Sequence, residues 1–158
     1  MAAMNGLDLA LSQALERRDA AAQVVAHVRQ IWVNGRVQLD QLESYALECT
    51  DRWAAQQTNC IPEIMRHHYQ FMARLTHAIG LQTGIVSEQR RAVEHETEAL
   101  REAEARLESL RQLNAVRLRS LQQALDRREQ KQSDEQAALQ YRRRREQAGA
   151  STNFGGGI

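Results

Sequence analysis

Histidine and cysteine are the side chains in this sequence that could bind a transition metal, and they gather in its middle. Cys60, His67, His68 and His77 lie in one short stretch. A zinc site needs ligands that converge on one point. If the stretch is helical, His67 and His77 point to different sides of the helix. We therefore expect no metal site, and we expect His68 to pack against a neighbouring helix.

Charged residues are the other candidates for chemistry. Between Glu94 and Glu108 glutamates alternate with arginines, a pattern typical of ion pairs within an exposed helix rather than of acid–base catalysis. The basic run Arg142 to Arg145 could contact nucleic-acid phosphates, but cations are also favoured near a helix C-terminus. The net charge is only +1, which gives no global field for nucleic acid.

Motifs for catalysis or cofactor binding are absent from the sequence. It has no glycine-rich phosphate loop, no nucleophile elbow and no ligand-spaced cysteine pairs. We predict that the protein is not an enzyme and has no catalytic residues, cofactor, metal or nucleic-acid partner.

The composition favours long helices over a globular domain. The chain of 158 residues has one proline, Pro62, and only 4% aromatic residues, while Ala, Leu, Glu, Gln and Arg dominate. No apolar run reaches the roughly 18 residues of a membrane span. Two cysteines without a recognisable signal peptide indicate a reducing compartment, so we expect a cytoplasmic protein.

Apolar residues recur at alternating spacings of three and four over the first segment, about residues 7–57. This period predicts a helix with a supercoiled partner, and the frame skips only Arg18 and Gly35. The apolar positions are Leu7, Leu11, Ala14, Ala21, Val25, Val28, Trp32, Leu39, Leu42, Ala46, Cys49 and Trp53.

Residues 58–62 interrupt the pattern. Pro62 is unfavourable inside a helix but favoured in a first turn, and Thr58 or Asn59 could cap that turn. A short turn requires the second helix, about residues 63–147, to run antiparallel to the first.

The second helix repeats an apolar position every seven residues. The repeat comprises Met65, Met72, Ile79, Val86, Val93, Leu100, Leu107, the polar Asn114, and Leu121. Its companion positions mix apolar residues with long polar ones such as Gln82 and Gln89, so the predicted seam is only moderately stable. Gly80 and Gly84 could mark a soft point or a close approach of the two backbones.

The two helices differ in length, about 75 Å against about 125 Å at 1.5 Å per residue. In a hairpin Leu7 would reach back to about Leu113, leaving a C-terminal overhang whose apolar stripe continues through Leu118, Leu121, Leu125 and Leu139. We expect residues 148–158 to be a disordered tail. The predicted fold is all-α: one long antiparallel two-helix coiled-coil hairpin with an overhanging C-terminal helix.

Aromatic residues lie beside the predicted seam at one place. Tyr45 and Phe71 are each one position off it, and the antiparallel pairing sets Tyr45 opposite Phe71 to Leu75. Such a cluster suits either flanking packing or a partner-binding patch, because aromatic anchors dominate such patches. Periodicity alone leaves both open.

Three stretches of the sequence stand out together: Gln38-Leu39-x-x-Leu42-x-x-Tyr45-x-x-Glu48, Phe71-x-x-x-Leu75-x-x-Ala78-Ile79 and the charged run Arg127 to Ala137. In this order and spacing they resemble the FliJ family of flagellar export stalk proteins. The resemblance covers roughly Leu7 to Arg145, and it departs at Cys49, where the family often has a tyrosine.

This resemblance implies a component of the flagellar type III export apparatus. Such a stalk binds the export ATPase ring, promotes its assembly and activity, and couples it to the cytoplasmic domain of the export gate and to export chaperones. It is expected to be monomeric alone and peripheral to the inner face of the cell membrane through its partners. The positions implied for gate binding are Gln38, Leu42, Tyr45, Phe71, Leu75 and Ala78.

Three alternatives remain open from the sequence. An equivalent stalk of a virulence-type secretion system would share the hairpin. A structural coiled coil would associate with itself in a concentration-dependent way. An arginine-rich nucleic-acid binder would lose affinity steeply with salt.

Overall fold

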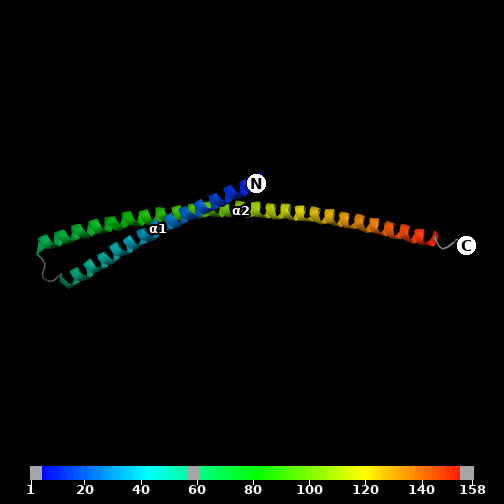
Figure 1. Ribbon diagram of the computed structural model, residues 1–158. Helices are drawn as coiled ribbons and strands as arrows, with labels where there is room; N and C mark the ends of the chain where they lie inside the picture. The colour runs from blue at the N-terminus through cyan, green and yellow to red at the C-terminus, as the bar shows by residue number, and fades with distance from the viewer. Residues whose placement is uncertain (1–4, 57–60, 154–158) are drawn as a thin grey trace. The chain divides into compact units, whose positions relative to one another are not determined.

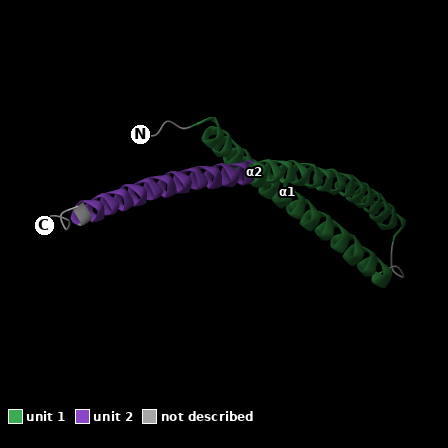
Figure 2. Ribbon diagram, turned by 90° about the vertical axis from the view of Figure 1, so that its right-hand side faces the viewer, with its two compact units in different colours: residues 1–109 green, residues 110–158 purple. Residues whose placement is uncertain are grey.

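The computed structural model describes residues 5–56 and 61–153, and these residues form two helices. Helix α1 spans Gly6–Gln56 and helix α2 spans Pro62–Asn153, with 51 and 92 residues (Figure 1). No strand occurs in the two described ranges. Two compact units divide the chain, residues 1–109 and 110–158 (Figure 2). Unit 1 contains α1 and the first part of α2, and unit 2 contains the rest of α2.

Both helices begin with satisfied backbone groups. The Oδ1 of Asn5 accepts a hydrogen bond from the backbone N–H of Asp8 at 2.9 Å, which is the geometry of an N-cap. Pro62 occupies the first position of α2, where its missing N–H costs nothing. The carbonyl of Ile61 accepts from the N–H groups of Ile64 and Met65. The predicted cap at Thr58 or Asn59 lies outside the described residues.

Contacts between the helices confirm that unit 1 is an antiparallel hairpin. Trp53 stacks on His68 with ring centroids 4.0 Å apart, and Tyr45 meets Phe71 at 6.0 Å. Farther from the turn, Gln82 donates a hydrogen bond to the carbonyl oxygen of Gly35 at 3.0 Å. The partner's number on α2 rises as the number on α1 falls.

The seam buries one stripe of each helix. On α1 the stripe keeps the spacing of three and four from Leu7 to Trp53, and it includes Arg18 and Gly35, the two positions that the apolar frame skips. The most buried apolar side chains are Ala14, Val25, Leu75, Val93 and Leu107. Half-buried seam residues are Leu11, Val28, Trp32, Leu39, Trp53, Met72, Ile79, Val86 and Leu100.

Gly35 is a point of close contact between the helices. A Cβ on Gly35 would collide with the side-chain amide of Gln89, so this side chain of α2 lies directly against the backbone of α1. Gly80 and Gly84, which the sequence suggested for such an approach, have nothing within 4 Å of an added Cβ. They lie on the outer surface of α2 and are not points of contact with α1.

Helix α2 also extends past its predicted end. It continues through Ala148 and Gly149 to Asn153, so the expectation of a disordered tail is wrong for residues 148–153. Alanine is the strongest helix former, and no proline follows the helix, so a single glycine does not end it. Residues 154–158 lie outside the described range. All side chains from Leu118 to Ser151 are exposed.

Candidate partner-binding site on the hairpin

The histidines of the hairpin serve packing near the turn. His68 is half-buried, and its ring lies nearly parallel to that of Trp53, with an interplanar angle of 7°. His67 and His77 are exposed. The described part of the chain brings no three metal-ligating side chains together, while Cys60 lies outside that part. The predicted position of His68 against the neighbouring helix is therefore correct.

Tyr45 of α1 and Phe71 of α2 form an exposed aromatic pair. Their rings meet edge to face with an interplanar angle of 90°. The residues keep 46% and 41% of their surface exposed, although each contacts the other across the hairpin. Such a pair is worth about 0.5–1.5 kcal/mol beyond its buried area. The contact thus holds two large apolar surfaces in a fixed position facing solvent.

The other residues proposed for the patch divide into a surface set and a supporting set. Gln38 is exposed, and its Oε1 accepts a hydrogen bond from Gln82 Nε2 at 3.4 Å. Leu75 is only 7% exposed because its side chain lies in the seam. Leu42 and Ala78 are half-buried. Leu75 therefore packs inside the hairpin, close in sequence to Phe71, and presents no free surface to a partner.

A shallow hollow on α1 adjoins the exposed pair, and sequence reasoning missed it. Tyr45 and the apolar Val37 both line it. Helical spacing of three and four along one outer face is the signal that could have found it. Its lining residues are Val37, Asp40, Gln41, Ser44, Tyr45 and Glu48.

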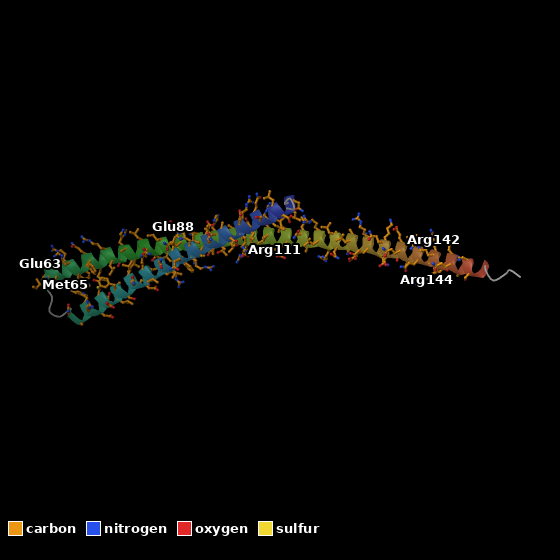
Figure 3. The ribbon with its side chains drawn as sticks, in the orientation of Figure 1. Glu63, Met65, Glu88, Arg111, Arg142 and Arg144 are labelled. Carbon is orange, nitrogen blue, oxygen red and sulfur yellow. The ribbon has the colours of Figure 1, made fainter. Side chains whose placement is uncertain are left out.

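Charged side chains pair along each helix rather than across a site. Arg90 lies 3.8 Å from Glu94, and Arg101 lies 3.4 Å from Glu98, both as exposed pairs one turn apart. Exposed pairs of this kind contribute at most about 1 kcal/mol. Arg142 and Arg144 lie on the solvent-exposed C-terminal part of α2 (Figure 3). These charges keep the surface hydrated and form no concentrated site.

The arrangement can bind a partner through apolar contact, and it shows no acid–base constellation in the residues described. Neither α1 nor the described length of α2 has a stretch long and apolar enough to cross a membrane.

Comparison with known proteins identifies the family. A family model described as "Flagellar FliJ protein" matches residues 4–146, nearly the whole chain. No curated protein and no solved structure matches the chain. The family is a component of flagellar type III protein export and is not known as a family of enzymes. The helical hairpin and the matched residues agree, and the chain belongs to the FliJ family of flagellar export stalk proteins.

Proposed function

We propose that this protein is the central stalk of the flagellar type III export apparatus. In this role it binds the export ATPase ring, promotes ring assembly and activity, and couples the ring to the export gate and to export chaperones. It acts in the cytoplasm at the inner face of the membrane, held there by its partners, and is monomeric alone. Membership of the FliJ family and the long helical hairpin support this role.

The observation that carries the gate-binding part is the exposed contact between Tyr45 and Phe71. Aromatic side chains that stay exposed while being held in place are typical anchors of a binding surface. In this proposal Gln38, Tyr45 and Phe71 touch the gate. Leu42, Leu75 and Ala78 fix the spacing of the two helices beneath them.

The ATPase ring would bind the C-terminal part of α2. There Leu121 and Leu125 are each about half exposed, and they line a shallow hollow with Ala124 and Arg128. An isolated helix with a partly apolar face gains stability when a partner covers that face. A ring that encloses the helix would supply such a cover.

The gate-binding surface is tested by substituting its two rings. Tyr45→Ala and Phe71→Ala should each weaken binding to the cytoplasmic domain of the export gate by about tenfold or more, since aromatic anchors often contribute over 1.4 kcal/mol. Binding is measured by titration calorimetry, and circular dichroism should show unchanged helix content.

Tyr69→Ala is the matched control. Tyr69 is also exposed, at 58%, but among the described residues its ring pairs with Trp53 and His68 rather than with Tyr45 or Phe71. Equal losses for Tyr69→Ala and Phe71→Ala, or no loss for either, would show that the patch is not the gate-binding surface.

A further inference from the structure

The two sides of the hairpin seam in unit 1 have different chemistry. Over residues 24–45 of α1 and 71–92 of α2, one side holds the residues directly before every second seam position of each helix. This set, called here the apolar side, consists of Val24, Ile31, Gln38 and Tyr45 of α1 with Phe71, Ala78, Ile85 and Ala92 of α2. It contains no charged residue, although a quarter of the whole chain is charged (26%). Beyond these ranges the same offset gives charged residues, Arg17 and Arg52 of α1 and Arg106 of α2.

Cross-hairpin contacts show that these eight positions share one side. Tyr45 touches Phe71, and Gln38 accepts from Gln82, which lies near Ala78 on α2. Because the helices are antiparallel, a step of seven residues toward the N-terminus of α1 is matched by a step of seven residues toward the C-terminus of α2. Ile31 therefore lies level with Ile85, and Val24 lies level with Ala92.

A shared hollow at the far end of the hairpin agrees with this register. Seven residues beyond Val24 and Ala92, the register sets Arg17 level with Ala99, and these two residues line one hollow together with Arg106.

Seven of the eight positions of the apolar side are exposed, and Ala78 is half-buried. Val24 is 42% exposed, Ile31 40% and Ile85 46%, similar to the Tyr45 and Phe71 pair at its other end. Single exposed apolar residues are ordinary, but exposed apolar residues that repeat every seven residues on the same side of two adjacent helices indicate an interaction surface.

The opposite side of the seam provides the contrast. Its flanking positions are Ala22, Arg29, Arg36, Glu43 and Thr50 of α1, and Tyr69, Thr76, Thr83, Arg90 and Thr97 of α2. Arg36, Thr83 and Arg90 line one hollow there, so charges and hydroxyl groups lie together on that side.

We propose that the apolar side binds one amphipathic α-helix of a partner protein, which packs along both helices and completes a three-helix bundle. From Phe71 to Ala92 the surface covers 22 residues of α2, a length of about 32 Å, which is about six turns of a bound helix. The small residues Ala78 and Ala92 leave room for its larger apolar side chains between Phe71 and Ile85. The inference rests on the proposed function only in assigning Tyr45 and Phe71 to a partner surface.

Charge at the far end specifies the partner further. Arg17 and Arg106 share the hollow with Ala14, Ala99 and Ala103, where Glu102 is the only carboxylate. Neither arginine forms an ion pair within the described ranges. The partner helix should therefore carry an Asp or Glu near the end that reaches these arginines. A second copy of this chain would not supply one from the same surface, because the apolar side contains no carboxylate.

The test uses a synthetic peptide of about 25 residues, long enough for six to seven helical turns. It has leucines on one face, uncharged polar residues elsewhere and two glutamates at one end. Its binding to the full chain is followed by fluorescence anisotropy. Ile31→Glu with Ile85→Glu should weaken binding at least tenfold. Thr76→Glu with Thr83→Glu, the same change on the opposite side, should leave it unchanged.

Additional variants separate the charge effect and guard against misfolding. Arg17→Gln with Arg106→Gln should weaken the glutamate peptide severalfold but leave a glutamine version of the peptide unaffected. If the double glutamate variant loses helix content by circular dichroism, Ile31→Ser with Ile85→Ser should give the same loss of peptide binding in a folded protein.

Three outcomes would overturn the inference. The first is that the peptide fails to bind the unaltered chain, and the second is that it binds the Ile31→Glu, Ile85→Glu variant as well as the Thr76→Glu, Thr83→Glu variant. The third is a dimer, detected by sedimentation, that Ile31→Glu dissociates, because a second copy of the chain would then occupy the surface. Gate binding is measured on the same variants. If gate binding depends on Tyr45 and Phe71 while peptide binding does not change on substitution of Ile31 and Ile85, this inference is wrong and the proposed function stands. If peptide binding depends on Ile31 and Ile85 while gate binding does not depend on Tyr45 and Phe71, the helix-binding surface stands and the gate assignment is wrong.

Discussion

Replacing Gln89 with leucine should stabilise the hairpin, although it removes a polar residue that helps to define the seam. The Oε1 of Gln89 is buried, and no hydrogen-bond partner reaches it within the described residues. It lies against Gly35 of α1, where a Cβ would be only 3.1 Å from Gln89 Cδ. Leaving a buried polar group unsatisfied costs about 1–3 kcal/mol.

Gln89→Leu removes this penalty and adds partly buried apolar surface. Full burial of a leucine contributes about 1.5–3 kcal/mol, and the site is half-buried, so about 1 kcal/mol is expected from this source. The two effects together should raise the free energy of unfolding by about 2 kcal/mol. Leucine has a similar volume to glutamine, so little overpacking is expected.

Urea unfolding followed by tryptophan fluorescence is the appropriate assay. Trp32 and Trp53 are the only two tryptophans, and both lie in the seam of unit 1, so their signal reports separation of the helices there. Gln70→Leu, at an exposed position of α2, is the control and should change stability by less than about 0.5 kcal/mol. The reasoning is refuted if Gln89→Leu unfolds at the same or a lower urea concentration than the unaltered protein.

The remaining predictions concern packing and helix propensity. Leu107→Ala removes a side chain that is only 3% exposed and should cost about 2–4 kcal/mol in the same urea assay, while Leu118→Ala, at a 53% exposed position, should cost under about 0.5 kcal/mol. Gly80→Ala and Gly84→Ala should each stabilise α2 by about 1 kcal/mol, because an added Cβ meets nothing within 4 Å; a loss of thermal stability in either would contradict the open surroundings. Leu75→Ala should lower stability by about 2 kcal/mol as well as weaken gate binding, and a binding loss at full stability would place Leu75 at the surface.

Much of the fold follows from the sequence because the seam repeats. The spacing of three and four on α1 predicts each position of its buried stripe from Leu7 to Trp53, and Pro62 predicts where the second helix starts. Periodicity places Gly35 in the seam, but it does not show which side chain of α2 packs against this glycine. Gly80 and Gly84 were candidates by residue type alone, whereas Gly35 lies in the seam and they do not.

The sequence predicts the aromatic pair of the candidate site, but it does not predict the exposed apolar row that continues from it. One-residue offsets from the seam place Tyr45 and Phe71 together, and the structure shows them in contact. Leu75 lies seven residues before Gln82 in the same seam register, so periodicity predicts that its side chain is buried, whereas the family motif alone does not separate a buried residue from a surface contact. The exposed row through Ile31 and Ile85 required both helices in register, which a single helix pattern does not provide.

ATP hydrolysis by the cognate export ATPase, titrated with this protein, tests the stalk role most directly. The ATPase is kept at concentrations below those at which it assembles into rings on its own. We expect stimulation that saturates near one stalk per ring. Absence of stimulation by a chain shown to be folded by circular dichroism would contradict it.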